Sequence, residues 1–540
     1  MFHDQRLSVR VPDVRVAVRC APNDVVSRVR ASVAWPLWLL TAATLALAGS
    51  AAGQASPTIA APELPRVVPE FQDPYPGRQC STTLRPQANI TSALRSARGG
   101  TVICLTAGAV YGPVELPARA RGDTGWIVLR TRTEMPPAGT RIRPSDAKLF
   151  AKIVQPNNGT PALTTRPGAS HCMLHGLEIT VDPSVTQTYG LVELGNSGRD
   201  QDAMNEVPGP LILSQMYIHG TPKGEMQRCV ALNSGATAIV DSWLSDCHGK
   251  GYDSQAIGNW NGPGPHLIRN NHLEGAGENV MWGGATPSIQ NLVAADITFQ
   301  RNHVYTPISW KGVWTKKNLF ELKNAVRVLI EENVFDGSWL DAQTGPALVF
   351  KSINDEGNCN WCRTTDVTVR RNHVTNAAGG IVFSGAENYS GGKVDSVARR
   401  FLVQDVVFDK INVAPYTGSG MAVQITGGPS DIVMERTVIA GNIYITVVLD
   451  QVRPAPRTAF RNNVWAHGEA LATADGPVVG GPSLQKGAPG FVWRGMAIVR
   501  KAELNVLPPG TVVVGNEAAV PLARQIRATV AAAVRGVIVQ

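Results

Sequence analysis

A short phrase of hydrophobic and polar positions recurs through the middle of the chain. Each copy reads apolar residue, two polar residues, asparagine, any residue, apolar residue. Clear copies lie at 268–273, 299–304, 330–335, 369–374 and 460–465, and degenerate copies lie at 174–179, 213–218, 239–244, 403–408 and 434–439. Their fourth positions are 26 to 39 residues apart, which fits one coil of a solenoid with loops of variable length.

A second short apolar run lies between the copies, at 255–257, 280–282, 320–322, 348–350, 381–383 and 423–425. Each coil therefore contributes at least two strands. Stacked coils pair in parallel about 4.8 Å apart, so equivalent positions form columns along the axis. One such column contains Asn271, Asn302, Asn333 and Asn372. We expect their amides to satisfy backbone groups of the coils above and below, which is a structural role.

Composition agrees with an all-β chain. The 540 residues include 53 Gly and 37 Pro, and 17% are charged, which suits a structure with many turns and not a helical bundle. The net charge is +8, of which residues 1–30 contribute +3. No block of Lys or Arg alternates with aromatic residues, so we expect no nucleic-acid partner, whereas an acidic polysaccharide is compatible with the charge.

The first 55 residues have the pattern of a targeting element. Arginines precede an uncharged, leucine-containing stretch at 31–61, which predicts a signal peptide. The alternative is an N-terminal membrane anchor, because 33–53 is about long enough to span a bilayer. We therefore expect a secreted or periplasmic protein, or an inner-membrane anchored one if the leader remains, with a linker at 56–79.

Seven cysteines follow the leader. In an oxidising compartment their spacing allows three disulfides: Cys80 with Cys104, Cys229 with Cys247, and Cys359 with Cys362. The last pair is a single Cys-x-x-Cys without a second pair or a nearby His, which is weak evidence for zinc.

The segments 88–97 and 99–108 look like the amphipathic capping helix and first strand of a known architecture. Together with the repeat, they make residues 80–500 resemble the secreted right-handed parallel β-helix proteins, which include pectate lyases and related polysaccharide-acting enzymes. The stretches 253–257, 260–265 and 277–284 further resemble a bacterial β-helix group without an assigned reaction.

This resemblance implies an all-β, single-stranded right-handed parallel β-helix with short helical caps, and a substrate groove along one sheet. The C-terminal cap is expected at 501–540. Within it, 518–534 has apolar residues at spacings of four, which predicts a helix that covers the last coil.

Alignment of the second strand of each coil suggests where chemistry lies. It places Lys323 and Lys351 on the outer surface of adjacent coils, with Glu321 beside them. A lysine near another cation can act as a base or bind a uronate carboxylate, and β-elimination needs both roles. The alternative is an ordinary surface ion pair.

The same alignment puts Asp253 and Glu278 in a second column, about one coil apart. Two carboxylates about 5 Å apart are what a retaining glycosidase requires, one as acid and one as nucleophile. Strict alternation would turn both inward, so they are expected in the preceding turn. There the alternative role is capping of backbone N–H groups.

Other candidates surround these pairs. His248 is the best single candidate for proton transfer, and Trp260, in a loop rich in Gly and Pro, is the better stacking platform for a sugar, since Trp282 belongs in the core. Lys250 and Asn279 complete the expected substrate-binding set.

We expect no metal site and no cofactor. His272 and His303 lie on adjacent coils but lack a clear third ligand, and no carboxylate cluster supports Ca²⁺.

These observations predict a monomeric protein that binds, and cleaves, a polysaccharide through a groove centred on 246–351. Cleavage by a lyase and by a glycoside hydrolase both remain open. The alternative from a different class is a non-catalytic carbohydrate-binding or cell-surface scaffold, for which the ladders only make a rigid rod.

Overall fold

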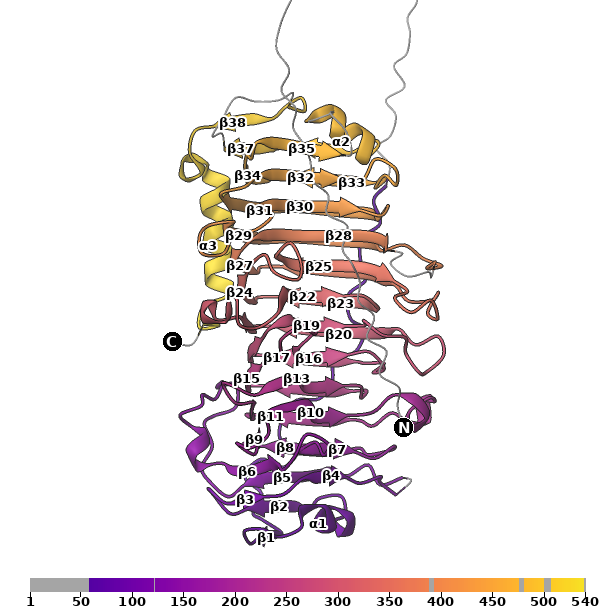
Figure 1. Ribbon diagram of the computed structural model, residues 1–540, viewed down its shortest axis with the longest axis vertical. Coiled ribbons are helices and arrows are strands. Elements are labelled where there is room, and N and C mark those ends of the chain that lie inside the picture. Colours follow the sequence, from indigo (N-terminus) through magenta and orange to yellow (C-terminus); the bar gives the residue numbers. More distant parts are fainter. Residues whose placement is uncertain (1–57, 121, 388–392, 475–479, 500–506, 539–540) are drawn as a thin grey trace, which may run out of the picture. The chain divides into compact units, whose positions relative to one another are not determined.

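The computed structural model describes residues 58–120, 122–387, 393–474, 480–499 and 507–538. In the compact unit that starts at Ser56, the chain winds into a stack of coils whose strands pair in parallel (Figure 1). The expected right-handed parallel β-helix is confirmed. The leader at 1–55, with its candidate anchor at 33–53, lies outside the described residues. In the part of the chain that is described, no helix has the length and apolar content to cross a bilayer.

Each coil has three sides, which we call sheets 1, 2 and 3. Sheet 1 contains β1 (Thr82–Leu84), β2 (Val102–Leu105), β5 (Ile127–Thr131), β8 (Cys172–His175), β11 (Leu211–Ser214), β14 (Thr237–Val240), β17 (His266–Arg269), β20 (Ala294–Gln300), β23 (Ala325–Glu331), β26 (Thr364–Arg370), β33 (Thr458–Arg461) and β36 (Val492–Arg494). Sheet 2 contains β3 (Val110–Tyr111), β6 (Ala151–Gln155), β9 (Leu177–Val181), β12 (Tyr217–His219), β15 (Trp243–Cys247), β18 (His272–Gly275), β21 (His303–Tyr305), β24 (Val334–Ser338), β27 (His373–Ala377), β34 (Val464–Ala466), β37 (Ala497–Val499) and β38 (Val512–Val514). The long strands β29 (Arg399–Ile411) and β31 (Ser430–Gly441) run through both.

Sheet 3 is a separate 12-stranded sheet. It contains β4 (Val114–Leu116), β7 (Leu163–Thr165), β10 (Gln187–Leu194), β13 (Glu225–Leu232), β16 (Gln255–Asn259), β19 (Gly277–Trp282), β22 (Lys316–Leu322), β25 (Pro346–Ile353), β28 (Gly379–Glu387), β30 (Met421–Thr426), β32 (Ile445–Leu449) and β35 (Ala470–Ala474). The inward side chains of all three sheets form one continuous core, in which rings such as Phe299 and Phe320 meet edge to face at 5.0 Å.

The turn between sheets 1 and 2 contains the asparagine ladder. Asn302 Oδ1 accepts hydrogen bonds from the backbone N–H of Asn271 at 2.9 Å and from its side-chain amide at 3.0 Å. Asn302 Nδ2 donates to the carbonyl of Ile268 at 2.9 Å. Asn333 and Asn372 repeat this pattern, and all of these side chains are fully buried. The expected structural role of the column is confirmed.

The ladder also explains an unusual backbone conformation. The residue before each ladder asparagine has a positive φ although it is not glycine, for example 56° at Arg301 and 58° at Glu332. Such a conformation costs on the order of 1 kcal/mol. The buried amide bonds of the following asparagine hold the turn closed and offset that cost.

Helices lie at both ends of the stack (Figure 1). The helix that the sequence predicted over the last coil lies elsewhere. Helix α1 (Ile90–Ser96) caps the first coil with the buried Ile90 and Leu94, as expected. Helix α2 (Gly481–Gly487) packs Leu484 into the other end of the core.

The predicted C-terminal helix exists as α3 (Pro521–Ala533), but its expected position over the last coil is wrong. It lies along sheet 2, where Ile526 and Val530 cover an outward column that includes Val407 and Val438. That column is apolar at those coils, so the helix buries it along the side of the stack.

The described part of the expected linker, residues 58–79, is an extended strap on sheet 1. Backbone N–H groups of Ala60, Glu63 and Arg66 donate to the carboxylates of Asp431, Asp366 and Asp296, respectively. These three aspartates occupy one column and alternate with Arg457, Arg400 and Arg327, which pair with them. The expectation of a simple linker missed this column of acceptors, because it forms only when the coils stack.

The three expected disulfides are present: Cys80–Cys104, Cys229–Cys247 and Cys359–Cys362. The seventh cysteine, Cys172, is a buried thiol, and burial raises its pKa to about 11.

The ladder predicts a large cost for removing one amide from its middle. Asn302→Ala leaves the buried N–H of Asn271 and the carbonyl of Ile268 without partners, so we expect a loss of about 3 kcal/mol in the free energy of unfolding. Urea denaturation followed by circular dichroism measures this loss. The matched control is Asn158→Ala, at an exposed position, with an expected change within about 0.5 kcal/mol. Equal midpoints for the two variants would contradict a supporting role for the ladder.

Candidate functional site

Charged and polar side chains gather on the outer face of sheet 3, across five neighbouring strands from β13 to β25. We call this set the charged strip. It comprises Arg228, Asp253, Gln255, Glu278, Lys317, Asn318, Glu321, Lys323 and Lys351. The register Ile257–Val280–Phe320–Leu348 fixes the coils relative to one another.

Pairs of consecutive core residues turn these side chains outward, and a β-bulge adds one more residue beside them. Gly277 pairs with Lys316 and Glu278 pairs with Asn318, so Lys317 is an extra residue in β22. Beyond the bulge, Leu319 and Phe320 both belong to the core although they are consecutive. Strict alternation therefore fails at this corner, and Glu278 lies on the outside of the sheet, in contact with Lys317.

Asp253 and Glu278 do not occupy equivalent positions on adjacent coils, as the sequence predicted, but their carboxyl groups do lie close together. Glu278 stands opposite Gln255, which donates to Glu278 Oε2 at 3.0 Å, and Asp253 lies two residues earlier. The two carboxylates meet instead on Lys317, whose Nζ contacts Asp253 Oδ1 and lies 3.0 Å from Glu278 Oε1. Because both oxygens are within hydrogen-bonding distance of one nitrogen, they are no more than about 6 Å apart.

The three groups of this cluster differ in exposure and in pKa. The Asp253 side chain is 35% exposed and that of Lys317 22%, whereas Glu278 is fully buried. Burial raises the pKa of Glu278, and the negative charges of Glu321 and Asp253 raise it further. Burial lowers the pKa of Lys317, but Glu278 and Asp253 more than reverse this effect and leave it raised. These shifts move Glu278 toward its protonated form and Lys317 toward its charged form.

The expected neighbours Lys323 and Lys351 are confirmed as adjacent in the column that continues from Leu322 and Phe350. Both ammonium groups approach Glu321, Lys351 at 3.1 Å and Lys323 at 3.9 Å. Burial alone would raise the pKa of Glu321, but the two lysines and a hydrogen bond from Asn318 lower it to about 2. Glu321 is therefore an ionised, fully buried carboxylate that fixes both lysines.

Trp260 lies at the edge of the charged strip, and one face of its ring is already covered. The guanidinium of Arg228 stacks 4.4 Å from the ring centroid. That face is therefore not available to a sugar.

Asn279 does not face a substrate. Its amide donates to the carbonyls of Leu273 and Tyr305 inside the coil, so its expected substrate-binding role is wrong. It directly follows Glu278 on β19, so ordinary alternation turns it to the opposite face.

His248 is not the solvent-accessible loop residue that the sequence suggested. Its ring is fully buried, stacked on Trp314 at 4.1 Å and edge-on to Trp310 at 4.7 Å. A group enclosed in this way cannot exchange protons with a substrate on sheet 3. Lys250 is exposed in the turn between β15 and β16, as a substrate-binding residue would be.

One feature of the site carried no usable sequence signal. Lys317 was not a candidate, because nothing in the sequence marks it as the extra residue of a bulge. In the described ranges, no group of three or more His, Cys, Asp or Glu side chains is arranged to hold a metal ion.

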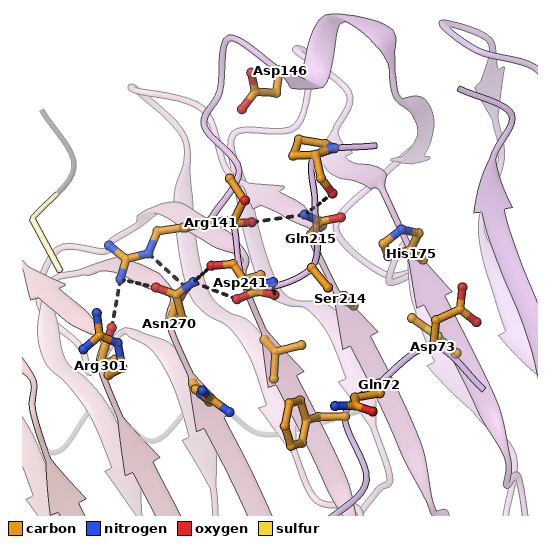
Figure 2. Close-up of a pocket in the computed structure, with 18 of the residues that line it drawn as sticks. Gln72, Asp73, Arg141, Asp146, His175, Ser214, Gln215, Asp241, Asn270 and Arg301 are labelled. Atoms are coloured by element: carbon orange, nitrogen blue, oxygen red, sulfur yellow. Dashed lines mark hydrogen bonds between the residues drawn. The ribbon is translucent and has the colours of Figure 1, made fainter. Parts of the chain in front are cut away.

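A hollow lies on sheet 1, away from the charged strip. It has a volume of about 1170 Å³ and is lined by the strap, by residues of the excursion 136–146 and by outward residues of β8 to β17 (Figure 2). It could not be predicted from the sequence, because its walls come from segments that are distant along the chain.

Neither a protein-family model nor a curated protein sequence matches this chain. Similar solved structures include a PL6 family alginate lyase, with 13% identity and a TM-score of 0.39 over 80% of this chain and 53% of that one. This chain thus spans about half the length of that lyase. A GH87 alpha-1,3-glucanase from Streptomyces thermodiastaticus matches at 11% identity and a TM-score of 0.42, over 79% and 67%. The A-module of a mannuronan C-5 epimerase from Azotobacter vinelandii matches at 12% identity and 0.39, over 79% and 94%. Scores this low do not align individual side chains.

The buried ion cluster around Glu321 predicts pH-dependent stability. The folded-state pKa of about 2 lies below the ordinary value of about 4.3, so the ionised carboxylate stabilises the fold above about pH 4.5, and this contribution disappears as the pH falls toward 2. At pH 7 we expect Glu321→Gln to lower the free energy of unfolding by about 3 kcal/mol. Urea denaturation at pH 7 and pH 3 should show the gap between wild type and variant narrowing. The exposed Glu134→Gln serves as control, and a gap that stays constant with pH would contradict the ion cluster.

Proposed function

We propose that the charged strip binds a polysaccharide and hydrolyses a glycosidic bond with Glu278 and Asp253. The observation that carries this proposal is the meeting of both carboxyl groups on the single ammonium of Lys317. Retaining glycosidases hold their two carboxyl groups about 5 Å apart, and this cluster is compatible with that separation. Hydrolysis thus accounts for a carboxylate pair that a rigid rod would not need.

The extent of the strip favours a polymer over a small molecule. From Arg228 on β13 to Lys351 on β25 there are four steps between coils, or about 19 Å. Along this length the side chains of Asp253 and Lys317 are partly exposed, at 35% and 22%, so a sugar hydroxyl could reach them. A linear polysaccharide is therefore the substrate class that we infer.

Different environments give the two carboxyl groups different tasks. Glu278, with its raised pKa, keeps a proton and donates it to the leaving glycosidic oxygen. Asp253, which is partly exposed, attacks the anomeric carbon and forms the glycosyl-enzyme bond. Glu278 then takes a proton from the water that releases the sugar, which restores both groups.

Lys317 must move for this chemistry to occur. Its ammonium lies between the two carboxyl groups, and Glu278 is fully buried behind it. The side chain is 22% exposed and sits at the bulge, where it can swing toward a bound sugar hydroxyl. Substrate binding would thus uncover Glu278, and the free protein would hold the pair in a protected form.

Lysine-assisted β-elimination is less well supported. Both Lys323 and Lys351 already engage the ionised Glu321, and a substrate uronate would have to compete with that buried carboxylate. The third buried lysine, Lys316, has its pKa lowered to about 7 by burial, but its Nζ donates to Thr306 and to the carbonyl of Asn318 inside the coil. It cannot reach a substrate on the outer face.

We expect Asp253→Asn and Glu278→Gln each to lower kcat about 100-fold or more on the polysaccharide that the wild type cleaves, because each removes one of the two reacting groups. New reducing ends measure the activity. On an aryl glycoside with a good leaving group, Glu278→Gln should retain more activity than Asp253→Asn, since that leaving group needs no proton. Azide should restore part of the activity of Asp253→Ala by replacing the nucleophile.

The exposed Asp202→Asn, outside the charged strip, is the matched control and should keep full activity. Unchanged activity in both carboxyl variants would remove the pair from the reaction. Binding of a polysaccharide without any new ends across a broad panel would instead support the non-catalytic scaffold, which the complete burial of Glu278 also favours.

A further inference from the structure

One wall of the cavity on sheet 1 is held in place by Gln215, Asp241 and Asn270. These residues lie one above another in the turn between sheets 1 and 2, and we call them the turn column. Gln215 Nε2 donates to the carbonyls of Pro136 and Thr140, each at 3.1 Å. Asp241 Oδ2 accepts from the N–H of Gly139 at 2.9 Å, and Asn270 Nδ2 donates to the carbonyl of the same glycine at 3.0 Å. The excursion is thus tied to three consecutive coils, and Figure 2 shows these bonds beside the cavity.

The opposite wall is the strap, which is also packed in place. Phe71 covers Ala238, Val240 and Leu267 on the outer face of sheet 1. The guanidinium of Arg269 lies 5.2 Å from the centre of the Phe71 ring. A flat aromatic surface and a planar cation therefore stand together at the edge of the cavity.

The floor is one outward column of sheet 1, with His175, Ser214, Val240 and Arg269 in register on successive strands about 4.8 Å apart. His175 Nδ1 is buried and has no hydrogen-bond partner among the described residues. Burial lowers the pKa of His175, so the ring is neutral. A buried polar atom of this kind at a cavity indicates a missing hydrogen-bonding partner.

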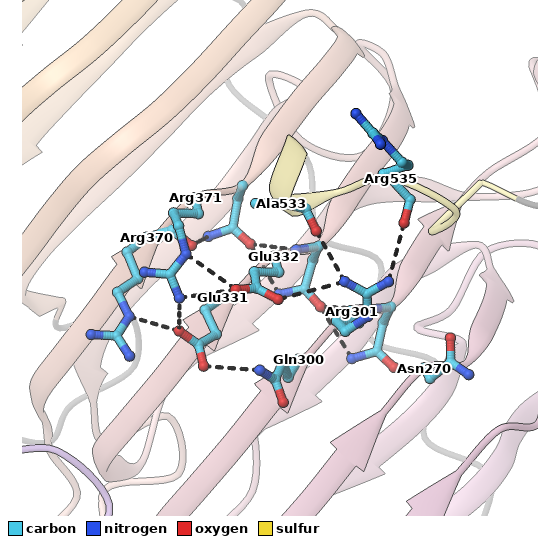
Figure 3. Close-up of polar contacts among 12 residues, drawn as sticks. Asn270, Gln300, Arg301, Glu331, Glu332, Arg370, Arg371, Ala533 and Arg535 are labelled. Carbon is cyan, nitrogen blue, oxygen red and sulfur yellow. Dashed lines mark hydrogen bonds and ion pairs between the residues drawn. The ribbon is translucent and has the colours of Figure 1, made fainter. Parts of the chain in front are cut away.

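Two of the four arginines that line the cavity are already engaged. Arg141 donates to the carbonyls of Asn270, Arg301 and Val537. Arg301 donates to the carbonyl of Ala533, the last residue of α3, and to that of Arg535 beyond it, as Figure 3 shows. These guanidinium groups hold the C-terminal segment and are not available to a ligand.

The other two arginines, Arg143 and Arg269, form no ion pair within the described ranges. The acidic residues of the lining are already engaged. Asp73 lies 3.8 Å from Arg130, and Asp146 accepts from the backbone N–H of Arg143. Asp241 is bound to the excursion as described above. The lining holds four arginines and three aspartates, and Asp73 pairs with Arg130 outside it, so the net charge of the cavity is positive.

We propose that this pocket binds an anionic sugar unit, with its acid group on Arg269 and Arg143 and its hydroxyls on Ser214 and His175. A guanidinium fork matches a carboxylate or sulfate, and the Phe71 ring under Arg269 holds that fork in place. The volume of about 1170 Å³ admits a short oligosaccharide. This site is independent of hydrolysis on sheet 3, because it lies on another side of the coil.

Isothermal titration calorimetry on the full chain tests the proposal with three probes: trigalacturonate, a sulfated trisaccharide and maltotriose. We expect an acidic probe to bind, more weakly as salt increases, and maltotriose not to bind. Arg269→Gln should weaken binding about tenfold or more, and Arg269→Lys less, because lysine keeps the charge but loses the fork. Preference between the two acidic probes then separates a carboxylate from a sulfate ligand.

Arg143→Gln, in the exposed part of the excursion, gives a second variant that does not disturb the contact with Phe71 and should also weaken binding. The exposed Arg132→Gln is the charge-matched control and should bind normally. Asp253→Asn should leave this binding unchanged, so failure here is distinct from failure of the hydrolytic site. Equal affinity in wild type, Arg269→Gln and Arg143→Gln, or no binding of either acidic probe, would overturn the proposal.

Discussion

The buried asparagine ladder is the interaction on which the rest of this structure depends. Each amide joins two coils through backbone N–H and carbonyl groups that no strand can satisfy at a turn. Because the ladder sets the turn, it also sets the register of the strands on both sides of it. Every column of outward side chains inherits that register, so chemistry on this molecule is organised by columns about 4.8 Å apart and not by local sequence motifs.

The charged strip and the sheet 1 pocket use this frame in different ways. On sheet 3, consecutive core residues such as Leu319 and Phe320 break the alternation, and the extra residue Lys317 supplies the cation that Glu278 and Asp253 share. On sheet 1, the frame stays regular, and the polar residues of the turn column hold an excursion that closes a cavity. One fold thus presents an elongated charged strip, for which we propose a polymer, and a separate cavity, for which we propose a shorter ligand.

Much of the fold follows from the sequence, whereas the site follows only in part. The repeat predicts the coils, the ladder and the adjacency of Lys323 with Lys351, because these depend on spacing and parity alone. The prediction fails where parity is broken, as at Asn279, and where distant segments meet, as at His248 between Trp310 and Trp314. Helix α3 was located correctly in the sequence but placed on the wrong surface, since its apolar stripe does not specify which apolar surface it covers.

The chemical identity of the product tests the central claim most directly. The protein digests its polysaccharide substrate in ¹⁸O-labelled water. Mass spectrometry of the new ends, together with ultraviolet absorbance, then separates hydrolysis from β-elimination. Hydrolysis by Glu278 and Asp253 predicts one ¹⁸O atom at each new reducing end and no absorbance from unsaturated uronates. Unlabelled ends accompanied by that absorbance would show β-elimination and would contradict the account given for the carboxyl pair.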